Sequence, residues 1–253
     1  MGILPVLLFS SFLPFLIGKE YIFIFTLFIF FLKKWAKKRW NQQDIWMSLG
    51  FSHFRYSLFN HSFIKELLKS FLIISFWILL LIFGDFVKFK SGINYSFLFD
   101  VLFTSIFVGV AEELLFRVWV FEELKLFLST NQAIFCQSIL FSMVHPYNFG
   151  ESLTVNILMK IGLSLLGVYL NLLRINNYPN IFPSIAFHSG IVGLMFLAKS
   201  TLHVQGNYPY LIYGIQYDNF INPVSGLIGI FALLILNLYQ IKNLKKLSKF
   251  GSD

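Results

Sequence analysis

Long apolar stretches, broken by short polar segments, run through almost the whole chain. An apolar stretch extends from Ile3 to Leu32, and six further candidate spans follow without the apolar–polar alternation that is typical of strands. These six are Ser70–Gly84, Tyr95–Phe121, Asn131–His145, Thr154–Leu173, Ile181–Ala198 and Pro223–Tyr239. The pattern predicts an all-α fold, a polytopic transmembrane bundle of about seven or eight helices.

The N-terminal stretch leaves two arrangements open. Gly18-Lys19-Glu20 interrupts Ile3–Leu32, which can form either one broken span or a tight hairpin of two. No charged segment precedes it and no small-residue cleavage site follows it, so we expect no cleaved signal peptide. The mixed stretch Lys33–Lys69 carries three tryptophans and is expected to lie at the cytoplasmic interface.

Composition supports the membrane class. Hydrophobic residues make up 57% of the 253 positions and charged residues 13%, against about 45–50% and 25% in soluble domains. A soluble chain with so few charges could not cover this much apolar surface, and the same abundance of apolar residues excludes disorder. The single cysteine, Cys136, excludes a disulfide framework and a CxxC metal site.

The net charge of +8 comes largely from two basic segments. One is Lys33–Arg39, and the other is the tail that begins at Lys242. Cytoplasmic flanks of membrane proteins collect Lys and Arg, so we expect both segments, and the C-terminus, on the cytoplasmic side next to anionic lipid. No nucleic-acid partner is expected, because no binding module accompanies the basic residues. Abundant Phe, Ile, Lys and Asn are typical of an AT-rich genome and indicate a bacterial inner membrane.

Apart from Asp100 near the start of Tyr95–Phe121, six acidic, basic or histidine residues fall within the candidate spans. They are Glu112, Glu113, Arg117, His145, Lys160 and His188. A charged side chain at the middle of the bilayer costs at least about 2.5 kcal/mol, so such residues indicate a functional site by default. The alternatives are a helix end that reaches the headgroups, for the glutamates, and a hydrogen-bonded packing role for each histidine.

Helix geometry places two of these residues at one depth. If Tyr95–Leu128 is one helix that turns at Ser129-Thr130-Asn131, Glu112 lies roughly 25 Å and His145 roughly 21 Å from that turn. Two antiparallel helices would therefore bring them to nearly the same level of the membrane. Ser, Thr and Asn are good capping residues for such a turn.

Helix phasing separates the two glutamates. Glu113 and Arg117 are four residues apart with the acid first, which is the favourable order for an ion pair. Glu112 points about 100° away and need not share that arginine. We therefore expect a structural Glu113–Arg117 pair and a Glu112 side chain that faces a cavity.

Three interpretations of Glu112, His145 and His188 stay open at this point. They could bind zinc, since two histidines and a glutamate form a known catalytic ligand set, but no HExxH pair supports this. They could form a proton or ion pathway. Alternatively, Glu112 and His145 could activate a water while His188 stabilises an oxyanion. Spacing alone does not choose between them.

Three motifs stand in order on three of the predicted helices. EExxxR occupies Glu112–Arg117, FxxxH occupies Phe141–His145, and a third histidine is His188. Together they resemble the CPBP family of intramembrane glutamic endopeptidases (CAAX protease and bacteriocin-processing, also called Abi). The resemblance covers a CPBP-like catalytic core at 97–198. The apolar and basic pattern predicts N-terminal membrane segments with a basic interfacial stretch at 1–96, and a final transmembrane helix with a basic cytoplasmic tail at 199–253.

The resemblance also implies roles for the motif residues. Glu112 would be the base and His145 its partner in activating a water, and His188 would donate to the oxyanion. Glu113 and Arg117 would shape the site. The family chemistry implies no metal and no other cofactor, and its partners would be a peptide or protein substrate reached from the membrane, and the lipid bilayer. The substrate and the oligomeric state are left open.

The third motif departs from the family pattern. The family usually has Asn four residues after the third histidine, and this chain has Val192, which cannot donate a hydrogen bond. Ser184, Ser189 or Asn156 could replace the missing donor. The alternative function is therefore a non-enzymatic membrane scaffold or immunity protein that has kept the fold.

Overall fold

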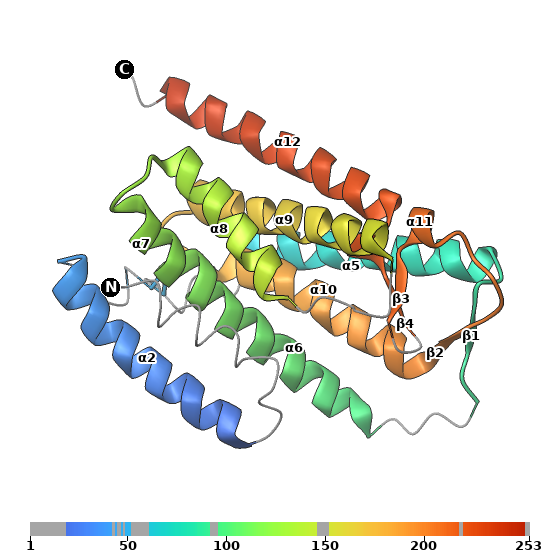
Figure 1. The fold of residues 1–253 in the computed structure, drawn as a ribbon. Coiled ribbons are helices and arrows are strands. Elements are labelled where there is room, and N and C mark those ends of the chain that lie inside the picture. Colours follow the sequence, from blue (N-terminus) through green and yellow to red (C-terminus); the bar gives the residue numbers. More distant parts are fainter. Residues whose placement is uncertain are drawn as a thin grey trace.

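The described residues form a bundle of helices with two small strand pairs (Figure 1). The computed structural model describes residues 19–41, 44, 47, 49–51, 61–91, 96–145, 152–217 and 220–250. Its helices are α2 (Lys19–Arg39), α5 (His61–Phe83), α6 (Phe97–Glu113), the π-helix η2 (Leu114–Val120), α7 (Phe121–Lys125), α8 (Thr130–Val144), α9 (Leu153–Asn176), α10 (Phe182–Thr201), α11 (Tyr210–Tyr213), the 3-10 turn η3 (Pro223–Ser225) and α12 (Leu227–Phe250). The predicted all-α bundle is confirmed.

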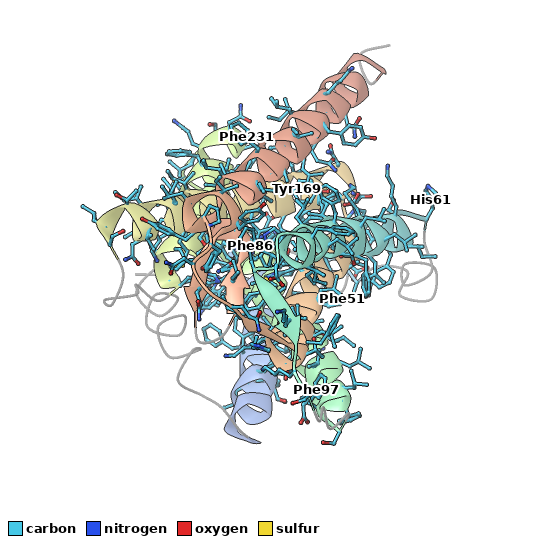
Figure 2. All side chains as sticks on the ribbon, turned by 90° about the vertical axis from the view of Figure 1, so that its right-hand side faces the viewer. Phe51, His61, Phe86, Phe97, Tyr169 and Phe231 are labelled. Atoms are coloured by element: carbon cyan, nitrogen blue, oxygen red, sulfur yellow. The ribbon has the colours of Figure 1, made fainter. Side chains whose placement is uncertain are left out.

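Helix α10 lies at the centre of the arrangement. It packs most extensively against α5 and α6 and also contacts α9 (Figure 1). Every residue from Ile181 to Ile191 is buried. The view in Figure 2 places the buried Tyr169 near the middle of the bundle and His61, where α5 begins, at its margin. A side chain on the first half of α10 is therefore shielded on all sides.

Among the described residues, four helices are long and apolar enough to cross a membrane. They are α5, α9, α10 and the part of α12 from Leu227 to Leu244. Helix α5 begins at His61, earlier than the predicted start at Ser70. The helix extends through this polar stretch because Glu66 and Ser70 continue the buried stripe of Ile74, and Lys69 pairs with Glu66.

One continuous helical run carries the EExxxR motif. Helix α6, the π-helix η2 and α7 follow one another from Phe97 to Lys125. Helix α8 then begins at Thr130, where Ser129 and Gln132 form a capping box. The predicted long helix and its turn are therefore confirmed, whereas the π-helical segment is a feature that periodicity did not predict.

Two antiparallel strand pairs were not predicted. Strand β1 (Val87–Phe89) pairs with β2 (Leu202–Val204), and β3 (Ile215–Tyr217) pairs with β4 (Phe220–Asn222). Each strand is three residues long, which is too short for apolar–polar alternation to be recognised. At the other terminus, α2 begins at Lys19, and residues 3–18 of the stretch Ile3–Leu32 lie outside the described residues.

Two glycines allow close helix contacts. A Cβ atom on Gly162 of α9 would lie 1.8 Å from the carbonyl oxygen of Val224, and one on Gly190 of α10 would lie 1.9 Å from Oγ of Ser70. Any larger residue would push these elements apart. The small residues thus set how closely α10 packs on α5, and with it the position of the neighbouring His188.

Candidate active site

Glu113 and Arg117 form a fully buried ion pair. Arg117 NH1 lies 3.2 Å from Glu113 Oε1, and both side chains are 0% exposed. Glu113 is the last residue of α6, and Arg117 belongs to η2, so the pair spans the junction between the α- and π-helical segments. The predicted i,i+4 pair is therefore present.

His188 lies between the two glutamates of the motif. Its Nδ1 is 2.8 Å from Glu113 Oε1, and its Nε2 is 3.7 Å from Glu112 Oε2. The first distance is a hydrogen bond, and the second is too long for one. Phasing predicted Glu113 only as the partner of Arg117, so the Glu113–His188 bond is a contact that sequence reasoning missed.

His145 follows the last turn of α8. Its Nδ1 lies 2.7 Å from the carbonyl oxygen of Phe141, one turn earlier. A carbonyl only accepts hydrogen bonds, so Nδ1 is assigned the proton and Nε2 of the neutral ring keeps its lone pair. The free lone pair makes Nε2 the atom that can accept a proton or bind a ligand.

The ring of Phe141 joins the three motifs. Its centre lies 4.7 Å from the His145 ring and 6.1 Å from the His188 ring. The guanidinium of Arg117 sits over its face at 4.3 Å, a distance suited to a cation–π contact. Glu112 and His188 also lie close enough to His145 to interact with it electrostatically. The structure therefore places Arg117, His145 and His188 around this ring and Glu112 and Glu113 beside His188, while the individual roles of these residues stay predictions.

Lys160 on α9 holds the end of α8. Its Nζ lies 2.9 Å from the carbonyl oxygen of Ser142 and 2.5 Å from that of His145, and Ser142 Oγ donates to the carbonyl of Lys160. The last carbonyls of a helix have no partner within that helix, and a lysine can satisfy them. The sequence marked Lys160 as an ionisable residue within a span, but no spacing rule predicts this contact with a different helix.

The three predicted substitutes for the third-motif donor lie in different surroundings. Ser184 Oγ donates to the Ile181 carbonyl at 2.8 Å and adjoins Glu113. Asn156 Nδ2 donates to the Ser152 carbonyl at 3.2 Å. Ser189 Oγ has no hydrogen-bond partner among the described residues and lies against Gly109. Ser184 is therefore the hydroxyl placed next to the glutamate cluster.

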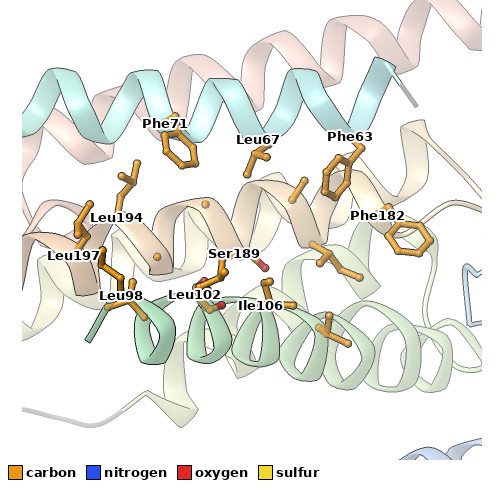
Figure 3. A pocket seen from close by; sticks show the side chains of 17 residues that line it. Phe63, Leu67, Phe71, Leu98, Leu102, Ile106, Phe182, Ser189, Leu194 and Leu197 are labelled. Carbon is orange, nitrogen blue, oxygen red and sulfur yellow. Dashed lines mark hydrogen bonds between the residues drawn. The ribbon is translucent and has the colours of Figure 1, made fainter. Parts of the chain in front are cut away.

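An apolar cavity of about 500 Å³ lies between α5, α6 and α10 (Figure 3). Ser189 and Gly190, the two residues after His188, form part of its wall. Phe71, Leu102 and Ile106 line it as well and are exposed on the outside of the bundle. The cavity is therefore open to the surroundings of the helices rather than enclosed within them.

Residues 94–194 match the family model described as type II CAAX prenyl endopeptidase Rce1-like. This segment is Rce1-like. It spans less than half of the chain and contains all three motifs, so the predicted resemblance to the CPBP family is confirmed. The Rce1-like match indicates a hydrolase of the protease class and, with the apolar helices, an integral membrane protein. Comparisons with curated proteins and with solved structures found no match.

Proposed function

We propose that the chain is an intramembrane glutamic-type endopeptidase, in which Glu112 and His145 activate a water that attacks a peptide bond. The observation that carries this proposal is the position of His188 between Glu112 and Glu113, inside the Rce1-like segment. Two acids and two imidazoles close to one another supply the groups that general acid–base hydrolysis needs.

In the proposed reaction, Glu112 is the general base. Its Oε2 is buried without a hydrogen-bond partner in the described part of the chain, so it is available to bind a water. The water oxygen forms a bond to the peptide carbonyl carbon while one water proton passes to Glu112. His145 Nε2, with its lone pair, accepts a second hydrogen bond from the same water. Glu112 then returns the proton to the departing amine as the C–N bond breaks.

His188 is the proposed donor to the oxyanion. Its Nδ1 is held by Glu113, which in turn is held by Arg117. This arrangement orients the ring. Because Nδ1 donates to Glu113, the proposal requires His188 as the imidazolium, in which Nε2, 3.7 Å from Glu112, also carries a proton and can donate to the oxygen that becomes negative. Ser184 lies beside Glu113, and its hydroxyl would have to turn away from the Ile181 carbonyl to take the place of the absent asparagine.

The proposed substrate is a peptide or protein segment that arrives from the membrane. The apolar cavity runs along α10, where Ser189, the residue after His188, forms part of its wall, and it is open to the outside of the bundle, which suits an apolar stretch of substrate. A bacterial inner membrane with a cytoplasmic C-terminus completes the proposal. Both basic segments then face the anionic cytoplasmic leaflet.

One observation favours a second candidate. Val192 stands where the family usually has a donor, and loss of one oxyanion donor typically costs about 100–1000-fold in rate. A protein that has lost this activity could serve as a membrane scaffold or immunity factor. The intact cluster of Glu112, Glu113, Arg117, His145 and His188 favours the enzyme.

The proposal is tested by comparing the peptides in membranes that contain the wild type, Glu112→Gln or Glu122→Gln. Glu112→Gln keeps the side-chain volume but removes the base, so we expect cleavage products to disappear while the protein level is unchanged. Glu122 lies further along the same helical run and pairs with Lys125 at the surface, so its variant should retain the products. Products that persist in Glu112→Gln would refute the assignment of the base.

A further inference from the structure

A second polar cavity lies away from the motifs, where α5, α9 and α12 meet. Its volume is about 300 Å³. Apart from Leu173 and Tyr239, the residues that line it are polar side chains from the three helices: Ser62, Lys65 and Glu66 of α5, Asn176 and Asn177 at the end of α9, and Gln240 and Asn243 of α12. Neither the family motifs nor the proposed reaction uses any of these residues.

The acidic residue of this cavity is already neutralised. Lys69 Nζ lies 2.5 Å from Glu66 Oε1, and the hydroxyl of Tyr169 donates to Glu66 Oε2 at 2.6 Å. Lys69 also lies 2.8 Å from that hydroxyl, so the three side chains form a closed triad. Lys65, which is exposed, therefore gives the mouth of the cavity a positive charge.

The cavity also contains an acceptor without a donor. Asn176 Nδ2 donates to Gln240 Oε1 at 2.6 Å, but Asn176 Oδ1 is buried and has no hydrogen-bond partner in the part of the chain that the structure describes. A buried polar atom of this kind calls for a partner. The cavity thus offers one cation and one acceptor, and a ligand with an anionic group and a hydroxyl donor would satisfy both.

The cavity lies at the level where three candidate spans end. Helix α5 begins at His61, α9 ends at Asn176, and the apolar part of α12 ends at Leu244. Ends of membrane spans lie at the headgroup layer. Basic pockets between transmembrane helices at this level are suited to anionic lipid headgroups.

Apolar side chains continue from the cavity along the outside of both helices. On α5, Leu68 and Leu72 follow Lys65 on the same face and are 57% and 71% exposed. On α12, Ile235 and Leu238 precede Lys242 on one face and are 67% and 66% exposed. Each helix therefore presents a basic residue at headgroup level above an apolar surface for an acyl chain.

We propose that this cavity binds the headgroup of an anionic glycerophospholipid. The phosphate pairs with Lys65, a headgroup hydroxyl donates to Asn176 Oδ1, and the acyl chains lie along Leu68 and Leu72. Of common headgroups, phosphatidylglycerol has both the negative charge and the hydroxyls. The proposal does not depend on peptidase activity, because the cavity shares no residue with the Glu112 cluster.

The test measures lipid binding to the full-length protein in detergent by native mass spectrometry. The probes are phosphatidylglycerol, phosphatidylcholine and phosphatidic acid with identical acyl chains, and inorganic phosphate. We expect phosphatidylglycerol to bind about tenfold more tightly than phosphatidylcholine, and millimolar phosphate not to displace it. Equal binding of phosphatidylglycerol and phosphatidylcholine would overturn the proposal, as would displacement by phosphate alone, which would indicate a site for the free ion.

Two variants locate the binding. Lys65→Gln should weaken phosphatidylglycerol binding about fivefold, whereas Lys37→Gln, an exposed lysine in the other basic segment, should change it less than about twofold. Asn176→Ala should weaken binding of phosphatidylglycerol but not of phosphatidic acid, which lacks the glycerol hydroxyls of the phosphatidylglycerol headgroup. Equal losses in Lys65→Gln and Lys37→Gln would show general charge attraction and contradict a site. An unchanged lipid preference in Asn176→Ala would contradict the hydroxyl contact.

Discussion

Two buried acidic clusters in this molecule differ in how completely their atoms are hydrogen bonded. The outer cluster consists of Glu66, Lys69 and Tyr169, and both oxygens of Glu66 have donors there, from Lys69 and Tyr169. The central cluster consists of Glu112, Glu113, Arg117, His145 and His188. In it, Glu112 Oε2 and Glu113 Oε2 have no hydrogen-bond partner among the described residues. The side-chain nitrogens of Arg117 make no hydrogen bond to the described residues either, although NH1 lies 3.2 Å from Glu113 Oε1.

The difference separates a structural cluster from one suited to chemistry. Buried polar groups are nearly always satisfied in folded proteins, and those that are not often mark sites where a water, an ion or a substrate binds. The outer triad links α5 to α9 and leaves none of its glutamate oxygens free. The central cluster keeps carboxylate oxygens available next to two histidines, which is what the proposed water activation requires.

The largest expected effect comes from Arg117→Ala. It leaves Glu113 buried within the membrane without its cation, which costs about 3–5 kcal/mol of folding free energy. We expect a much lower protein level in membranes and a lower unfolding temperature in nanodiscs.

The double variant Glu113→Gln, Arg117→Met is the matched control, because it removes both charges and keeps similar volumes. It should recover much of the lost stability, since replacing a buried ion pair by neutral groups is often neutral. If the Arg117→Ala protein were as abundant in membranes as the wild type, Glu113 would not need Arg117 for stability. The contrast between the two clusters would then be lost.

Val192→Asn comes next and tests whether the central cluster lacks a donor. The change places an amide one turn from His188 on the same face of α10. If the missing donor limits the reaction, product formation should rise, by at most about 100–1000-fold. It should be preserved if Ser184 already fills that place. Cleavage rates of a substrate found in the Glu112→Gln comparison give the answer, and a loss of activity in a folded Val192→Asn protein would contradict the proposed oxyanion site.

Local rules predicted much of the central cluster. The i,i+4 spacing predicted the Glu113–Arg117 pair, and the capping residues near Ser129 predicted the turn that brings α8 back alongside. The Glu113–His188 bond depends on the rotation of α10, which is set where Gly190 packs on Ser70. That contact joins residues far apart in the chain, so no spacing rule could have found it.

The outer cluster was not predicted at all, for a related reason. Its members lie on α5 and α9, and the sequence pattern placed Glu66 and Lys69 in an interfacial stretch before the predicted span. Their i,i+3 spacing could have indicated a helical pair, but the donor that completes the triad is Tyr169, a hundred residues later. Distant hydrogen bonds of this kind require the three-dimensional packing.

Tyr169→Phe should have a smaller effect than Arg117→Ala. It removes one donor to Glu66 but leaves the Lys69 contact, so the expected loss is about 1–3 kcal/mol. The unfolding temperature in nanodiscs should fall moderately, and product formation by the remaining folded protein should be unchanged. A loss of stability larger than that of Arg117→Ala would show that the outer triad contributes more to the folding free energy than the Glu113–Arg117 pair does.

The smallest expected effect is that of metal removal. Zinc would use Nε2 of His145, Nε2 of His188 and the carboxylate of Glu112, the same atoms that the proposed mechanism gives to water and to the oxyanion. Because Glu112 accepts the proton directly in that mechanism, we expect purified protein to contain less than stoichiometric zinc and its peptidase activity to be insensitive to chelators. Elemental analysis and cleavage rates with and without chelator measure this. Stoichiometric zinc that is lost in Glu112→Gln, together with activity abolished by chelation and restored by added zinc, would instead make the central cluster a metal centre.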